Sequence, residues 1–301
     1  MATSTVERIL ELKKDRNAVI LSHNYQRGEV QDIADFVGDS LELSQKAANT
    51  NSDVIVFCGV HFMAETASIL NPNKKVLLPD TGAGCPMADM ITAEQLRQKK
   101  KELPGVTVVT YINSTAAVKA ESDYCCTSAN GVKVVSSITA KEILFVPDQY
   151  LGDFIAKKTG KQMHLWPGYC PTHVKILPED IIQRKKEHPK AKVVVHPECR
   201  PDVIALADEA LSTSGMIRYA AREDVKELIF GTEVEILHRL NKENPGKKFI
   251  PASKKAVCPN MKKITLEKIL DSLETLTPEV KVPEAIRVKA LIPVERMLKI
   301  V

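Results

Sequence analysis

Three apolar, β-branched segments recur along the chain, and each ends in a polar side chain. They cover residues 19–23, 106–111 and 193–196, with His23, Tyr111 and His196 at their ends. Short apolar runs of this kind predict buried β-strands with polar ends. His23 and Tyr111 are 88 residues apart, and Tyr111 and His196 are 85 apart, so the pattern predicts three repeated units that fill the chain.

Each unit continues with the same order of elements. Seventeen residues after each polar end comes a hydroxyl residue that predicts a helix start: Ser40, Ser128 and Thr213. A second apolar run follows in each unit, at residues 54–57, 143–146 and 228–230. A third apolar run then leads into a Cys-Pro pair, at Cys85, Cys170 and Cys258. Alternating strands and helices at this spacing favour parallel sheets covered by helices on both faces.

The sequence therefore predicts an α/β fold of three repeated three-layer αβα domains, with parallel sheets in a pseudo-threefold arrangement around a central active site. We place the three units at residues 18–102, 103–188 and 189–271. Terminal helices within 1–17 and 272–301 are expected to pack outside the repeat, the first through Ile9, Leu10 and Leu12. An apolar stripe marks the last helix: Ile286, Leu291 and Met297. Pro293 should kink that helix unless the helix begins there.

Composition and charge narrow the class of protein. The 301 residues are 44% hydrophobic and 27% charged, which is typical of a globular chain with a packed core. The net charge is only +4 and aromatic residues make up 5%, so a basic stripe with stacking aromatics, as nucleic-acid binding requires, is not expected. Neither a signal-peptide core nor an apolar run of about 18 residues occurs. We expect a cytoplasmic protein that binds neither nucleic acid nor membranes.

The seven cysteines are expected to be free thiols or metal ligands, because a reducing cytosol disfavours disulfides. Three of them occupy equivalent positions, one per unit, each followed by proline: Cys85, Cys170 and Cys258. The remaining four have no such equivalence and are interpreted as core or loop thiols: Cys58, Cys125, Cys126 and Cys199. Three thiolates gathered from three units suit a soft metal centre that keeps one position open for chemistry.

A zinc ion is the main alternative to an iron-sulfur cluster at these cysteines. Catalytic zinc also takes three protein ligands and keeps the fourth position for water, and Cys170 and His173 form a Cys-x-x-His pair. The chain has no Cys-x-x-Cys knuckle, and ligands so far apart in sequence favour a cluster. Spacing alone leaves both metals open.

Residues 38–41 read GDSL, a label of serine hydrolases, but that function requires a histidine preceded three residues earlier by aspartate. None of the histidines has one. Ser40 also matches Ser128 and Thr213 by repeat position, so anion binding at a helix N-terminus explains all three. Neither the G-x-G-x-x-G pattern nor the phosphate-loop lysine pattern of nucleotide-binding proteins occurs.

A series of ordered motifs resembles the quinolinate synthase family. The motifs are SHNYQ (22–26), DIADFVGDSLELS (32–44), GVHFMAE (59–65), YINST (111–115), TSAN (127–130), GYCPTH (168–173), HPEC (196–199) and CPNMK (258–262). They cover nearly the whole chain, and their common order with compatible spacing is far more specific than any one of them.

The resemblance implies three α/β domains around one four-iron four-sulfur cluster per chain, held by Cys85, Cys170 and Cys258. One iron would remain open as a Lewis acid. The implied activity is that of a transferase that condenses iminoaspartate with dihydroxyacetone phosphate, giving quinolinate, phosphate and water in de novo NAD biosynthesis. A partner enzyme that oxidises aspartate would supply the unstable iminoaspartate.

The matched motifs also suggest roles for polar residues. The substrates carry two carboxylates and one phosphate, and we expect the predicted helix starts to hold these anions by charge-assisted hydrogen bonds: Ser40, Ser128, Ser212 and Thr213. Tyr111 and Glu198 are the predicted proton-transfer groups. Five further residues are expected to orient the substrate and intermediates: His23, Tyr25, Asn113, His173 and His196. Of these, His23, Tyr25 and His196 are also expected to take part in catalysis.

The chain departs from the family pattern at two places. Ser214 stands where many relatives carry glycine, which affects the loop geometry but should leave anion binding intact. Cys258 is followed by Pro259, Asn260 and Met261 rather than by further cysteines, so we predict no disulfide switch there. Two other functions remain as alternatives: a zinc-dependent lyase or hydrolase, and a non-catalytic iron-sulfur binding protein.

Overall fold

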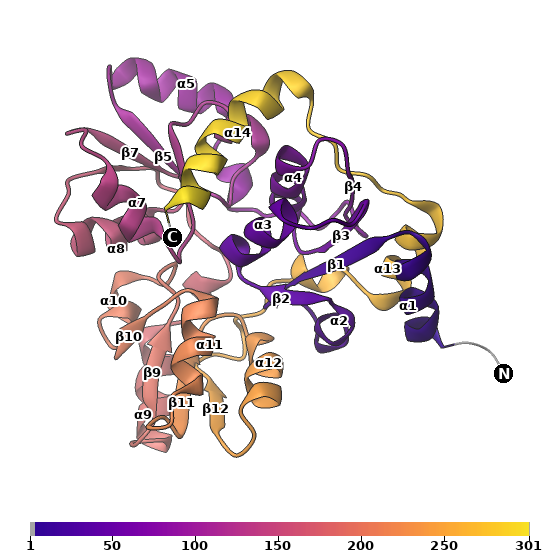
Figure 1. Ribbon diagram of the computed structural model, residues 1–301. Coiled ribbons are helices and arrows are strands. Elements are labelled where there is room, and N and C mark those ends of the chain that lie inside the picture. The colour runs from indigo at the N-terminus through magenta and orange to yellow at the C-terminus, as the bar shows by residue number, and fades with distance from the viewer. Residues whose placement is uncertain (1–3, 301) are drawn as a thin grey trace.

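The computed structural model describes residues 4–300 and contains three four-stranded parallel sheets (Figure 1). The first sheet consists of β1 (Ala18–His23), β2 (Phe36–Gly38), β3 (Val54–Cys58) and β4 (Lys75–Leu77). The second consists of β5 (Thr107–Tyr111), β6 (Tyr124–Cys126), β7 (Ile143–Val146) and β8 (His164–Leu165). The third consists of β9 (Lys192–Val195), β10 (Glu209–Ala210), β11 (Glu227–Gly231) and β12 (Lys248–Pro251).

Helices connect the strands of each sheet and cover its faces. The first unit has α2 (Gly28–Ile33), α3 (Ser40–Ala48), α4 (His61–Leu70) and α5 (Ala93–Glu102). The second has α6 (Ala116–Lys119), α7 (Gly131–Ser137), α8 (Gln149–Thr159) and α9 (Pro178–Glu187). The third has α10 (Pro201–Ile204), α11 (Thr213–Ala221) and α12 (Ile236–Glu243). The predicted α/β fold of three repeated αβα units is therefore confirmed.

All three sheets have the same strand order, in which the first strand of the unit lies between the second and the third. The central strands are the apolar runs that the sequence predicts, and their side chains are almost wholly buried. The short edge strands β2, β6 and β10 were not predicted, because two or three residues are too few to show an alternating pattern.

An aspartate repeats in each unit and fixes the edge strand to the central strand. One carboxylate oxygen accepts a hydrogen bond from a backbone N–H of the central strand, at 2.8 Å in every unit. The pairs are Asp35 with Ile20, Asp123 with Val108, and Asp208 with Val193. The separation of 15 residues in each pair is a second signature of the repeat.

The predicted helix starts differ in one position. Ser40 and Thr213 are the first residues of α3 and α11, whereas Ser128 lies three residues before α7 and not at its start. The physical reason is a turn: the side chain of Asn130 accepts a hydrogen bond from the backbone of Thr127 at 2.9 Å, and α7 begins only after it.

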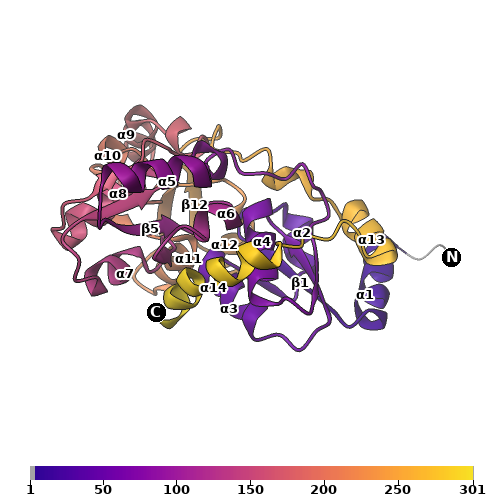
Figure 2. The ribbon, with the colours of Figure 1, turned by 90° about the horizontal axis from the view of Figure 1, so that it is seen from above.

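The terminal helices lie against the repeat, and Figure 2 shows both from above. Helix α1 (Thr5–Asp15) packs on β1 and on α13 (Leu266–Thr275) through the buried Ile9 and Leu12, while Leu10 is exposed. Helix α14 (Glu284–Lys299) crosses from α4 and α3 of the first unit to α6 and β6 of the second.

Helix α14 does not begin at Pro293 but continues through it. Ala290, Val294 and Met297 form a fully buried stripe on both sides of the proline, and burial of this stripe outweighs the lost hydrogen bond. The Asn130 amide donates to the carbonyl of Met297 and to that of Ile300, which fixes the end of α14 to the second unit. Among residues 4–300, the helices are all too short or too polar to cross a membrane.

Candidate active site

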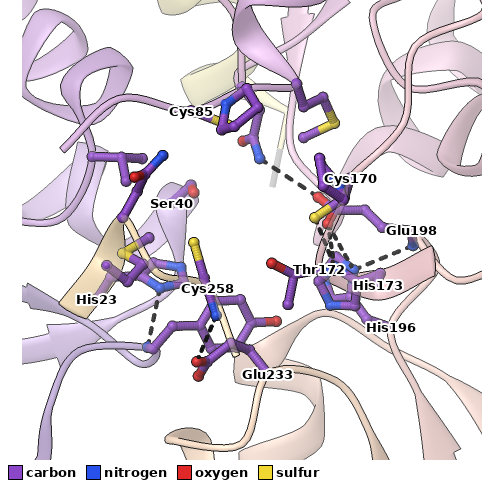
Figure 3. A pocket seen from close by; sticks show the side chains of 18 of the residues that line it. His23, Ser40, Cys85, Cys170, Thr172, His173, His196, Glu198, Glu233 and Cys258 are labelled. Atoms are coloured by element: carbon purple, nitrogen blue, oxygen red, sulfur yellow. Dashed lines mark hydrogen bonds and ion pairs between the residues drawn. The ribbon is translucent and has the colours of Figure 1, made fainter. Parts of the chain in front are cut away.

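One pocket lies where the three units meet, beyond the carboxyl ends of the central strands (Figure 3). This is the edge of a parallel sheet where functional groups are expected. The pocket is lined by residues from every unit. Apart from Ser212, all the site residues that the sequence predicts contribute to its walls.

Ser212 and Thr213 take different positions. The Ser212 hydroxyl accepts a hydrogen bond from the Gly215 N–H at 3.2 Å and caps α11, so it is engaged within its own helix. Thr213 lines the pocket, and its Oγ1 accepts a hydrogen bond from the Asn24 side chain of the first unit at 2.9 Å. Asn24 of the first unit thus orients the hydroxyl of Thr213 in the third unit.

Ser214, the departure from the family pattern, joins the same two units. Its hydroxyl donates to Glu42 at 2.5 Å, and Glu42 also accepts the N–H of Asp39, the N-cap residue of α3. The serine therefore connects the start of α11 to the start of α3. Asp39, Ser40 and Thr213 all line the pocket beside this connection.

The side chains of Cys85, Cys170 and Cys258 enter the pocket from three directions, one from each unit (Figure 3). Each cysteine is followed three residues later by a single turn of 3₁₀-helix. These turns are η1 (Ala88–Met90), η2 (His173–Lys175) and η3 (Met261–Lys263). The repeat of cysteine, proline and 3₁₀ turn holds three sulfur atoms in equivalent local backbone.

Two opposing effects act on the pKa values of these three thiols. Burial raises the pKa of Cys85 to about 12 and also raises the pKa values of Cys170 and Cys258. Backbone N–H groups act in the opposite direction, and each sulfur receives one from the third residue after it: Ala88, His173 and Met261. Such N–H groups stabilise thiolates at iron-sulfur centres.

The other four cysteines do not line this pocket and are buried in the hydrophobic core: Cys58, Cys125, Cys126 and Cys199. Burial raises the pKa of every one of these thiols. This placement agrees with their interpretation as core thiols.

Glu198 is the centre of the polar network in the pocket. Its carboxylate accepts a hydrogen bond from the Tyr111 hydroxyl at 2.5 Å, and the Nδ1 atom of His173 lies 2.7 Å from its other oxygen. Burial raises the pKa of Glu198, but His196, His173 and Tyr111 lower it by more, so the net pKa is below its ordinary value. The lowered pKa keeps Glu198 ionised, so its buried carboxylate acts as a hydrogen-bond acceptor.

His196 and Ser128 connect this network to the second unit. The Nε2 atom of His196 lies 3.2 Å from the Ser128 hydroxyl, and its ring stacks on His173 with the centroids 4.7 Å apart. Ser128 reaches His196 because it lies in the turn before α7 rather than inside the helix. Asn113 also faces the pocket, and its Oδ1 has no hydrogen-bond partner among the described residues, which leaves an acceptor for a ligand.

Sequence reasoning missed Thr232 and Glu233, which follow directly after β11. Thr232 contacts both Tyr25 and His173, at 2.5 Å and 2.9 Å. Glu233 is fully buried, accepts the N–H of Cys258 at 3.1 Å and pairs with Lys262 at 2.9 Å. Their position at the carboxyl end of a central strand is the signal that could have found them.

Buried neutral histidines predict acid sensitivity. Burial lowers the pKa of His23 and of His196 to about 3, so both are neutral in the folded protein above that pH. In the unfolded chain they take up protons below about pH 6.5. Full stability is therefore expected above pH 6.5, with a loss of about 1.4 kcal/mol per pH unit for each histidine as the pH falls toward 3.

The measurement is the thermal unfolding midpoint of the anaerobic protein between pH 7 and pH 4.5. His196→Gln should give a shallower pH dependence than the wild type, because one neutral group no longer charges on unfolding. His164→Gln, at an exposed histidine, is the matched control. Equal slopes in all three proteins would contradict the assignment.

Comparison with known proteins places the chain in a family. A sequence model of the family described as quinolinate synthetase A protein matches residues 7–299. The chain belongs to this family. It is 64% identical to a quinolinate synthase of Dehalococcoides mccartyi (strain CBDB1) over 294 residues, covering 98% of this chain and 97% of the relative. Quinolinate synthases of Geobacter metallireducens and Thermodesulfovibrio yellowstonii are 58% and 57% identical over 299 and 302 residues, covering 99% and 100% of this chain and 98% and 100% of the relatives.

Membership in the quinolinate synthase family confirms the resemblance inferred from the ordered motifs, and with it the prediction that the chain is an enzyme. The GDSL residues 38–41 fall within the region that matches this family.

Proposed function

We propose that this enzyme condenses iminoaspartate with dihydroxyacetone phosphate to form quinolinate, phosphate and water in the cytoplasmic route to NAD. The observation that carries the proposal is the entry of one cysteine from each unit into a single pocket, in a chain of the quinolinate synthase family.

Cys85, Cys170 and Cys258 would hold a four-iron four-sulfur cluster. Three free thiols, each supported by a backbone N–H, fit the chemistry of this group. When bound, the cluster supplies one iron without a cysteine ligand, which can act as a Lewis acid.

The spacing of the sulfur atoms favours a cluster over a single zinc ion. Thiolates bound to zinc at about 2.3 Å cannot be more than about 4.6 Å apart. Within residues 4–300, the metal-ligand group whose donor atoms all lie within 4.8 Å of one another is Cys170, His173 and Glu198, not the three cysteines. Cysteines that bind different iron atoms of one cluster lie further apart. Because His173 and Glu198 lie 2.7 Å apart and pair with each other, we assign both to the substrate rather than to a zinc ion.

The hydroxyl and acid–base residues of the pocket would bind the substrates and transfer protons. Ser40, Ser128 and Thr213 would bind the carboxylates and the phosphate, each from a different unit. Tyr111 and Glu198 would move protons. His23, Tyr25, His196, His173 and Asn113 would orient the substrate and intermediates, and an aspartate-oxidising partner would supply iminoaspartate.

The test is formation of quinolinate by anaerobically reconstituted protein. Iminoaspartate is generated in place by an aspartate-oxidising enzyme, dihydroxyacetone phosphate is added, and the product is identified by mass. Product from the complete mixture, and none when either substrate is left out, supports the proposal. Iron and sulfide with no quinolinate would favour a non-catalytic iron-sulfur protein, and zinc without sulfide would favour a zinc enzyme.

Ser128→Ala should weaken substrate binding. The hydroxyl lies at the pocket wall beside His196, and loss of one hydrogen bond to a charged group should raise KM about tenfold. Steady-state kinetics measures the change, with kcat nearly constant. Ser136→Ala, at an exposed serine of α7, is the matched control. If Ser128→Ala has the KM of the control, Ser128 does not bind the substrate.

A further inference from the structure

Hydrogen bonds connect α12, on the outside of the third unit, to Thr213 on the pocket wall. Arg239 of α12 donates from Nη1 to the side-chain oxygen of Asn24 at 3.0 Å, and the Asn24 amide donates to the Thr213 hydroxyl at 2.9 Å. Asn24 is fully buried and Thr213 is 3% exposed, whereas the Arg239 side chain is 24% exposed. Of these three residues, only Thr213 lines the pocket.

Further contacts hold Arg239 and Asn24 in place. The Nη1 atom of Arg239 also donates to the carbonyl of Val37 at 2.8 Å, and its Nε donates to Glu243 at 2.6 Å. Both hydrogens of Nη1 are therefore used, and the guanidinium is fixed between β2 of the first unit and α12 of the third. The backbone N–H of Asn24 donates to the carbonyl of Gly38 at 3.1 Å, which fixes the asparagine as well.

The direction of the hydrogen bonds follows from the arginine, because a guanidinium only donates. The atom of the Asn24 amide that faces Arg239 must therefore be the oxygen, and the N–H₂ group faces Thr213. The Thr213 oxygen accepts from it, so the hydroxyl must donate its own proton elsewhere. Within residues 4–300 this O–H has no acceptor, which leaves it available to a ligand in the pocket.

We infer that Arg239 and Asn24 are positioning residues that make Thr213 a hydrogen-bond donor to an anionic oxygen of the substrate. An ionised carboxylate or phosphate oxygen accepts such a bond, and the positive end of the α11 dipole lies at the same residue. The inference rests on the proposed function, which gives Thr213 an anion to bind. It adds two residues outside the pocket that decide which kind of group is bound.

The repeat shows that this support is particular to Thr213. Asn24 directly follows the polar end of β1, and the equivalent positions in the second and third units are Ile112 and Pro197. Neither of those side chains can donate or accept a hydrogen bond. The asparagine is therefore not a general requirement of the repeated fold, and it occurs where it reaches a predicted anion-binding hydroxyl.

The test measures binding of quinolinate and of inorganic phosphate to the anaerobically reconstituted holoenzyme by titration calorimetry. Asn24→Asp keeps the size of the side chain but accepts from both Arg239 and Thr213, which turns the Thr213 O–H away from the pocket. The dissociation constant should rise at least about tenfold, as expected for one lost hydrogen bond to a charged group. A rise for quinolinate alone assigns a carboxylate to Thr213, and a rise for phosphate alone assigns the phosphate.

Arg239→Met frees the Asn24 amide to turn and should also weaken binding, while kcat for quinolinate formation stays nearly unchanged. Arg239→Lys keeps a donor and should recover most of the affinity. In a Thr213→Val background, Arg239→Met should have no further effect, because Arg239 acts through the Thr213 hydroxyl. Arg218→Met, at an exposed arginine of α11, is the matched control.

An Arg239→Met protein that binds both anions as tightly as the control overturns the inference. An equal loss of affinity in the wild-type and Thr213→Val backgrounds does so too, as does a wild type that binds neither anion. Arg239 is partly exposed, so its variants decide the question even if the buried Asn24→Asp protein does not fold. A wild type that binds the anions but forms no quinolinate would instead overturn the proposed function.

Discussion

Replacement of any one of Cys85, Cys170 and Cys258 by alanine should abolish the cluster and the activity together. Each unit contributes one of these thiols to the pocket, so each substitution removes a ligand that the other units cannot replace. After anaerobic reconstitution, the wild type should contain about four irons and four sulfides per chain. Each variant should contain neither in stoichiometric amount, with quinolinate formation at background.

Cys58→Ala is the matched control, because Cys58 is a free, fully buried thiol outside the pocket walls. It should keep its iron and sulfide and lose only the modest stability of a small core contact, about 1 kcal/mol. Variants of the three pocket cysteines that retain the cluster would contradict the ligand assignment. Retained zinc without sulfide in the wild type would contradict the cluster itself.

The central strands and the repeat could be predicted because their signals are local. A buried parallel strand requires a continuous apolar run, and the three runs recur with one period. The edge strands β2, β6 and β10 could not be predicted from the sequence. They are held in place by a neighbouring strand and by the repeated aspartates, and their own residues show no apolar pattern long enough to indicate a strand. Whether α14 begins at Pro293 or continues through it could not be decided from the sequence either, because the helix on both sides of the proline is held by tertiary burial.

The walls of the site could largely be predicted because parallel strands bring their polar ends to one edge of each sheet. The hydrogen-bond partners within the site could not be predicted, because these hydrogen bonds join residues that are far apart in the sequence. Thr232 meets Tyr25 across 207 positions, and Ser214 meets Glu42 across 172. Ser212 and Thr213 are neighbours in the same motif, and only the helix geometry decides that one caps α11 while the other faces the pocket.

Glu198→Gln should lower kcat by about 10² to 10⁴-fold while the cluster is retained. Glutamine keeps the size of the side chain but presents an N–H₂ group where the carboxylate accepts hydrogen bonds from Tyr111 and His173. One of these donors must then turn away, and no base remains to take up a proton. Iron and sulfide content, together with steady-state kinetics, separates the loss of proton transfer from the loss of the metal centre.

Glu102→Gln, on the exposed last turn of α5, is the control for loss of a carboxylate as such and should behave as the wild type. A Glu198→Gln protein with wild-type kcat would show that Glu198 moves no proton in the slow step. Loss of the metal in this variant would instead mean that Glu198 is a metal ligand. Its donor atoms lie close to those of Cys170 and His173, with which it could then form a metal site. A Glu198→Gln protein that loses activity but retains the cluster also argues against a non-catalytic iron-sulfur protein. Such a protein would have no catalytic activity to lose.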